Sequence, residues 1–134
     1  MLPPAEDVTT LDNLPLILPT RSNSRRILVE KAFAEAGLRL NVAYQADGYS
    51  VIRSLLNAGL GYTILTHSAV SGEIALGSLS AAKLTRPRMS WTLSLAIPKE
   101  QRHNRVVQSI ARIVREETTR LVNNGDWYGE LCGA

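Results

Sequence analysis

The hydrophobic and polar positions of the chain fall into alternating blocks, which predict alternating strands and helices. Residues 14–18 form a short apolar run closed by Pro19, a pattern typical of a buried strand. Hydroxyl and amide side chains at 22–24 can cap a helix, and the stretch after them has apolar residues at helical spacing up to Gly37. The pattern therefore predicts a strand over 14–18 and a helix from about 24 to 36.

The strand–helix unit then repeats. After a second alternating strand, Asp47 and Gly48 form a turn whose carboxylate can cap the next helix, and Gly59 ends that helix. A third apolar stretch follows, and Thr66 can cap a short helix after it. The elements predicted here are strands over 40–46 and 60–65 and helices over about 49–58 and 67–74.

The two ends of the chain have different patterns. Residues 1–13 are polar and contain two prolines, so we expect a linker there. Residues 91–97 predict a strong strand. The longest helix is predicted from 104 to about 122, with an apolar stripe along one face and Glu116 paired with Arg120 four residues later.

The short connections between these elements favour right-handed crossovers and a mostly parallel sheet. The predicted fold class is α/β, a Rossmann-like three-layer lobe. Ligands of such sheets bind beyond the carboxyl ends of the strands, where the strand-to-helix loops should meet. Helix N-termini in these loops direct N–H groups and positive dipole ends at one spot, which suits a small anion or carboxylate. The candidate ligand-binding residues are Thr20, Arg21, Ser22, Asn23, Asp47, Gly48, Tyr49, Ser50, Thr66 and His67.

Composition limits the class of protein. The 134 residues and 45% hydrophobic content suffice for one domain, or two small lobes, around a core. No run approaches the roughly 20 apolar residues of a membrane span, so we expect no membrane partner. The first twenty residues contain acids but no lysine or arginine, so we expect no secretory signal peptide. Cys132 is the single cysteine, which excludes an intrachain disulfide and favours a cytoplasmic location.

The net charge of +3 comes from the second half of the chain. Between Lys83 and Arg115 there are eight basic residues and one acid, Glu100. Such a stretch can bind nucleic acid, but only Trp91 interleaves with it, so no platform for base stacking is visible. We interpret the stretch as a solvated face or a surface that meets another subunit.

No catalytic motif stands out. Gly59 and Gly61 occur at a helix-to-strand joint, so they predict a helix end and a tight turn instead of a dinucleotide-binding loop. The segment around Ser50 lacks the second glycine of a nucleophile elbow. We interpret His67 equally as a ligand contact or a local cap, and no metal-ligand spacing surrounds it or His103. We therefore expect no catalytic residue, no metal and no cofactor.

Several segments resemble one protein family in their order and spacing. Residues 16–20, with the arginine-containing helix start after them, and residues 33–37 (FAEAG) resemble the second regulatory lobe of LysR-type transcriptional regulators. The stronger match is the run over 51–65, VIRSLLNAGLGYTIL, where that family has a recurring pattern of apolar residues and glycines. The strand over 91–96 and the closing helix follow in family order, so the likeness spans about residues 14–128.

The resemblance implies a fold like one half of a type 2 periplasmic binding protein. It also implies an effector-sensing role within a bacterial transcription regulator. The second regulatory lobe would occupy 14–97, a linker or hinge 1–13, and the closing helix and tail 98–134. The candidate loops would form one wall of the effector site, although Thr66 stands where the family often has proline.

The same resemblance bears on partners. The family's winged helix-turn-helix and first lobe have no counterpart here, so DNA would be bound only through a missing N-terminal domain. Without that first lobe the closing strand and helix would leave apolar surface uncovered, from which we expect a homodimer or higher oligomer.

Three other functions stay open. The first is a lobe of a solute-binding protein, which an export signal upstream in the gene would support. The second is a small α/β enzyme, for which His67 is the one candidate base. The third is direct nucleic-acid binding by residues 83–115, which lack a recognisable groove-reading helix. We expect that this chain is not an enzyme.

Overall fold

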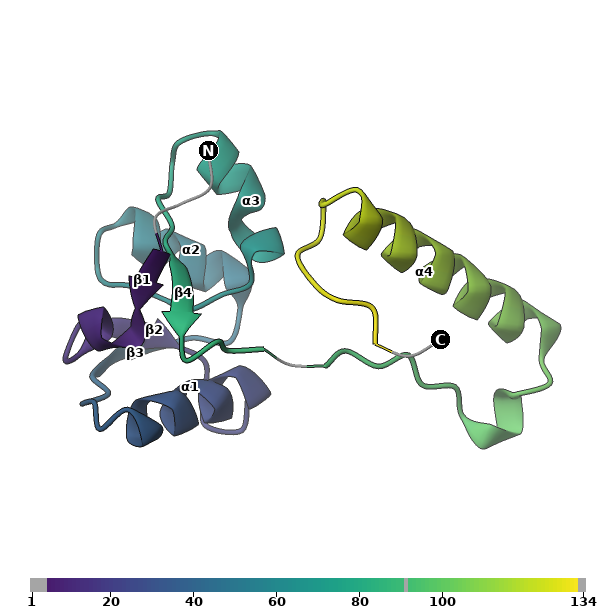
Figure 1. Cartoon of the computed structure of the whole chain (residues 1–134), viewed down its shortest axis with the longest axis horizontal. Coiled ribbons are helices and arrows are strands. Elements are labelled where there is room, and N and C mark those ends of the chain that lie inside the picture. The colour runs from purple at the N-terminus through teal and green to yellow at the C-terminus, as the bar shows by residue number, and fades with distance from the viewer. Residues whose placement is uncertain (1–4, 91, 133–134) are drawn as a thin grey trace. The chain divides into compact units, whose positions relative to one another are not determined.

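The computed structural model describes residues 5–90 and 92–132, which form two units, one up to Ser90 and one after it (Figure 1). The elements of the first unit are β1 (Ala5–Asp7), a 3-10 helix (Val8–Leu11), β2 (Leu16–Leu18), α1 (Ser24–Glu35), β3 (Val42–Gln45), α2 (Tyr49–Asn57), α3 (His67–Ala75) and β4 (Lys83–Arg86). The elements of the second unit are a 3-10 helix (Lys99–Gln101) and α4 (Arg105–Asn123).

The four helices predicted from the sequence are present in the described residues, and side-chain caps explain the starts of α1 and α4. The side-chain oxygen of Asn23 accepts a hydrogen bond from the backbone N–H of Arg25 at the start of α1. Asn104 does the same for Val106 at the start of α4. Gly37 follows the end of α1 with a φ of 67°, the left-handed conformation that glycine adopts without strain.

Two parallel strand pairs lie in the first unit. β2 pairs with β3, and β1 pairs with β4. Figure 1 shows these strands between α1 on one side and α2 and α3 on the other. The predicted α/β class with parallel strands between helical layers is therefore confirmed.

The third predicted strand, over 60–65, is wrong in extent. It is reduced to one parallel bridge between Tyr62 and Leu16. The backbone N–H of Ile17 donates to the carbonyl of Tyr62 at 2.7 Å, and the hydroxyl of Thr63 donates to the carbonyl of Ile17 at 2.7 Å. The Thr63 side chain thus takes a place that a backbone N–H would hold in a regular ladder, and β2 is still held on both edges.

The N-terminal segment, expected as a linker or hinge over 1–13, has regular secondary structure in its described residues. Its described residues form β1 and a 3-10 helix, and the carboxylate of Asp7 caps that helix by accepting from the N–H of Thr9 at 3.0 Å. Val8 is only 1% exposed. The segment gains its structure from pairing with β4, a strand far along the chain, and a polar local pattern does not reveal such a partner.

The core of the first unit joins β2 to α1. It consists of Val8, Leu16, Leu18, Val29 and Phe33, all nearly inaccessible to solvent. Burial of each such side chain contributes roughly 1.5–3 kcal/mol to stability. This cluster fixes the end of β2 relative to the start of α1, and the loop between those two elements carries the first group of candidate residues.

The second unit has no strand among its described residues. The predicted strand over 91–97 is wrong for residues 92–97, and Trp91 lies outside the described residues. A strand needs an edge with which to exchange hydrogen bonds, and the regular elements described in this unit are helical. The predicted pairing of Glu116 with Arg120 is also wrong, because Arg112 pairs with Glu116 and Arg120 with Glu117. No helix within 5–90 or 92–132 is both long and apolar enough to cross a bilayer.

Candidate functional site

Two of the three predicted loops meet through one side chain. The backbone N–H of Thr20 donates to Oδ1 of Asp47 at 3.0 Å, and the Thr20 hydroxyl donates to Oδ2 at 2.9 Å. The loop after β2 and the loop after β3 therefore lie together, as the parallel topology predicts. The expected role of Asp47 as a cap of α2 is wrong: Gly48 is the N-cap residue and no side chain caps this helix.

Exposed polar groups surround this contact. The side chain of Arg21 is 83% exposed, with its Nε 3.9 Å from Oε1 of Glu30. Ser22, in the loop after β2, and Ser50, in the first turn of α2, are also exposed. Asn23 is occupied as the cap of α1. The groups available to a ligand at this edge are thus a guanidinium and two hydroxyls.

The starts of α2 and α3 differ from the start of α1. Neither Gly48 nor Thr66, the two N-cap residues, caps its helix through a side chain. The N–H groups of a first helical turn have no partner within the helix and carry partial positive charge. Helix starts without such a cap suit a negatively charged ligand better than the Asn23-capped start of α1.

Tyr49 does not present its hydroxyl at the loop edge. The hydroxyl is buried, and the guanidinium of Arg53 lies 5.9 Å from the ring centroid. Arg53 also bonds the carboxylate of Glu73 on α3 at 3.1 Å, and this hydrogen bond lowers the pKa of Glu73. Burial, followed by the nearby charge of Glu73, raises the pKa of Tyr49. These three side chains hold α2 against α3.

The third group of candidates lies at the start of α3. Thr66 precedes the helix and accepts from the hydroxyl of Ser68 at 3.4 Å, and His67 is its first residue. Both are half-buried, and the Nδ1 atom of His67 is inaccessible to solvent. In the described part of the chain, no three His, Cys, Asp or Glu residues gather as a metal site would require.

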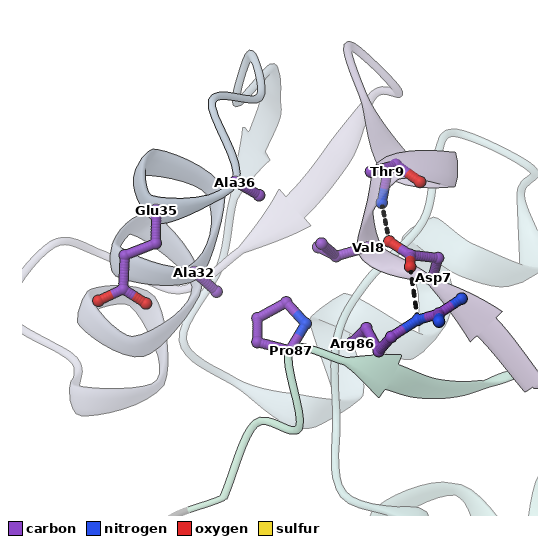
Figure 2. Close-up of a pocket in the computed structure, with 8 residues that line it drawn as sticks. All are labelled: Asp7, Val8, Thr9, Ala32, Glu35, Ala36, Arg86 and Pro87. Atoms are coloured by element: carbon purple, nitrogen blue, oxygen red, sulfur yellow. Dashed lines mark hydrogen bonds and ion pairs between the residues drawn. The ribbon is translucent and has the colours of Figure 1, made fainter.

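A hollow that the sequence did not predict lies at the C-terminal end of α1. It has a volume of about 280 Å³, near the small end of the range for ligand pockets. Figure 2 shows Arg86 bonded to Asp7, at 3.0 Å, with Glu35 directed away from them. The residues that line the hollow are Asp7, Val8, Thr9, Ala32, Glu35, Ala36, Arg86 and Pro87. They come from three separate segments, so no local pattern indicates the hollow.

Comparison with known proteins gives a consistent result. Residues 3–119 match the family model of the LysR substrate binding domain. The chain is 34% identical over 129 residues to the HTH-type transcriptional regulator BbuR of Bordetella bronchiseptica, covering 96% of this chain and 39% of that protein. It is 23% identical over 108 residues to the nitrogen assimilation regulatory protein nac of Escherichia coli K12, covering 81% of this chain and 35% of that protein. The aligned region is thus well under half the length of either relative.

Proposed function

Because the chain belongs to the LysR substrate-binding domain family, we propose that it is the effector-sensing part of a bacterial transcription regulator and that its effector binds at the Thr20–Asp47 edge. The observation that supports this location of the effector site is the pair of hydrogen bonds from Thr20 to Asp47, which joins two loops 27 residues apart. Polar side chains on both loops then face the same edge of the unit. Nothing in the structure favours a solute-binding or catalytic role.

The effector class that fits this edge is a small anion or carboxylate. Arg21 offers an exposed guanidinium, which binds carboxylates with two parallel hydrogen bonds. Ser22 and Ser50 offer hydroxyls, and the start of α2 offers N–H groups that no side chain caps. Asp47 holds Thr20 by hydrogen bonds, and the ring of Tyr49, at the start of α2, packs under Arg53. Thr66 and His67 would form the far part of the wall.

The mechanism of regulation would be a population shift. An effector that contacts this wall and a neighbouring lobe at once favours the arrangement in which both contacts form. DNA would be contacted by another part of the regulator, which is consistent with the name of the Bordetella relative, an HTH-type regulator. The chain itself would have no turnover and would work in the cytoplasm.

The proposal extends to association with a second copy. The apolar stripe of α4 is exposed: Val106 is 67%, Ile110 56% and Ile113 52% accessible. Exposed apolar side chains at helical spacing mark a surface that another element covers. We assign that surface to a homodimer or larger oligomer.

Titration of the 134-residue chain with a panel of small carboxylic acids, followed by calorimetry, tests the site. The Arg21→Ala variant should weaken binding by about tenfold or more, because a charge-assisted pair is lost. Lys31→Ala, which removes an exposed cation from α1, the helix that follows the Arg21 loop, is the control and should leave affinity unchanged. A carboxylate that binds both variants equally well would place the effector elsewhere.

A further inference from the structure

Arg26 is the one polar or charged residue among the described residues that is fully buried, with 3% of its surface exposed. A buried charge is unfavourable unless a partner compensates it. Nε of Arg26 lies 2.7 Å from Oε1 of Glu30, four residues later on α1. The charge is therefore paired, but the pairing does not explain the burial.

The same spacing occurs on the surface of the same helix. Lys31 and Glu35 pair at 3.7 Å with both side chains exposed. An i,i+4 pair thus forms on α1 without leaving solvent. What distinguishes the buried arginine is a second contact, from its terminal nitrogen to the carbonyl oxygen of Pro19 at 3.5 Å. Pro19 is a buried residue that directly follows β2 and precedes Thr20.

Glu30 makes a second contact as well. Its Oε1 lies 3.9 Å from Nε of Arg21, the exposed arginine of the first loop. One carboxylate therefore faces a buried and an exposed arginine. Because Arg26 is the nearer partner and already compensates the charge of Glu30, Arg21 is held only weakly and can turn to an anion.

We propose that Arg26 is a positioning residue of the effector site, which sets the loop from Pro19 to Arg21 through the Pro19 carbonyl and Glu30. The inference rests on the function proposed above. Asp47 holds the loop from the side of β3, whereas Arg26 holds it from the side of α1. An anion would then meet Arg21 on a loop whose backbone is already fixed, which reduces the entropy lost on binding.

Amide hydrogen exchange of the 134-residue chain, followed by NMR, tests this role directly. The reporters are the N–H of Thr20, bonded to Asp47, and the N–H of Asn23, bonded to the carbonyl of Thr20 at 3.0 Å. Phe33, inside α1, reports the stability of the helix and core. Arg26→Met should speed exchange of the two loop amides by about tenfold more than exchange of Phe33.

Two further variants separate positioning from simple destabilisation. Arg26→Lys keeps the charge but loses the planar fork that serves two acceptors, so it should restore loop protection only in part. Lys31→Met removes the exposed pair of the same helix and should change neither set of amides. Equal acceleration of loop and core amides overturns the positioning role. If Arg26→Met does not fold, the same comparison in Arg26→Lys decides.

The carboxylate titration distinguishes the two proposals. If the loop loosens in Arg26→Lys and carboxylate affinity falls, both stand. If the loop loosens and affinity is unchanged, the loop is not the effector site and the proposed function of this edge fails. If the loop amides stay protected, Arg26 does not position the loop, whatever the binding result.

Discussion

Gly61 lies where the segment after α2 meets β2. A side-chain Cβ at this position would overlap the carbonyl oxygen of Pro15. That carbonyl accepts a hydrogen bond from the N–H of Tyr62 at 2.9 Å, so it cannot move away without breaking the bridge between the two segments. The absence of a side chain at Gly61 is therefore a packing requirement as well as a feature of the turn.

Replacement of this glycine should be measurably destabilising. Gly61→Ala forces either the Pro15 carbonyl or the Tyr62 segment to shift, and we expect a loss of about 1–3 kcal/mol in the free energy of unfolding. Urea denaturation gives the value. Gly72→Ala is the control, because Gly72 lies within α3 with open space around it and should gain up to about 1 kcal/mol. Equal effects of the two variants would contradict the packing argument.

Two carboxylates of the N-terminal segment, Asp7 and Asp12, make the stability of the first unit depend on pH. A hydrogen bond from the backbone N–H of Thr9 lowers the pKa of Asp7, and one from the N–H of Arg39 lowers the pKa of Asp12. A pKa that is lower in the folded state means that the unfolded chain binds more protons in acid. The stability these groups confer is present above about pH 4, and it is lost as pH falls through their folded values.

The free energy of unfolding should therefore fall as the pH is lowered from about 5 to 3. Asp12→Asn should flatten this dependence, because it removes a titrating group while an amide oxygen can still accept from Arg39. Glu6→Gln removes a carboxylate that forms no ion pair within the described residues and is the control. Urea titrations at several pH values measure the effect, and an unchanged slope in Asp12→Asn would refute this assignment.

At the scale of elements, the contact between the two ligand loops depends on one acid. Asp47 accepts from both the backbone and the hydroxyl of Thr20, at 3.0 and 2.9 Å, so it fixes the loop after β2 relative to the loop after β3. A cap of α2 at this position would have stabilised one helix only. The observed contact instead couples α1 to α2 through their starting loops.

Removal of this carboxylate should loosen both loops together. Asp47→Ala should lower the free energy of unfolding by about 0.5–1.5 kcal/mol, the usual net value of a hydrogen bond. It should also speed exchange of the Thr20 amide. Ser50→Ala, in the first turn of α2, is the control, because its hydroxyl is exposed and is not part of this contact. A stable chain with a protected Thr20 amide in Asp47→Ala would show that the loops are held by other contacts.

At the scale of the whole molecule, the second unit leaves its apolar residues uncovered. Ala111 is the one fully buried residue of α4, whereas Ile110 and Ile113 are each more than half exposed. Leu93 and Leu95, in the segment predicted as a strand, are 67% and 47% exposed. This surface is the physical basis for the proposed association.

Light scattering over a dilution series should show a dimer or larger particle that dissociates as concentration falls. Ile110→Asp should shift the equilibrium toward monomer, because it places a charge on the apolar stripe. Ser109→Asp adds the same charge one residue away, at an exposed polar position, and should have little effect. A strictly monomeric particle at high concentration would refute association through α4.

Binding to DNA is the second whole-molecule prediction. The chain has a net charge of +3, but two basic residues of α4, Arg112 and Arg120, pair with the acids Glu116 and Glu117. We expect weak binding without sequence preference that is lost as salt rises, measured by fluorescence anisotropy with two unrelated duplexes. Sequence-specific binding at physiological salt would overturn this expectation.

The candidate site was predictable only in part. Parallel topology predicts that Thr20 and Asp47 share an edge, and their hydrogen bonds confirm it. The direction of Tyr49 was not predictable, because it depends on Arg53 and on Glu73 from another helix. Whether the loops bind an effector stays a prediction.

The sequence by itself determined the presence of the four helices and the capped starts of α1 and α4. Asn23 and Asn104 cap helices through N–H groups two residues later, and Gly37 ends one through its own backbone freedom. These interactions depend on neighbours within one helical turn, so a local pattern contains all that they need. The apolar run of β2 likewise needs only its own residues to predict burial.

Only the tertiary structure decided the contacts between distant segments. Thr85 bonds the carbonyl of Glu6 across 79 positions, and this pairing orders a segment that its own polar pattern predicts as a linker. Arg26 is buried and donates to the carbonyl of Pro19, just after β2, whereas Lys31 on the same helix is exposed. The register and burial of remote segments depend on contacts between residues far apart in the chain. A short stretch of sequence does not reveal those contacts.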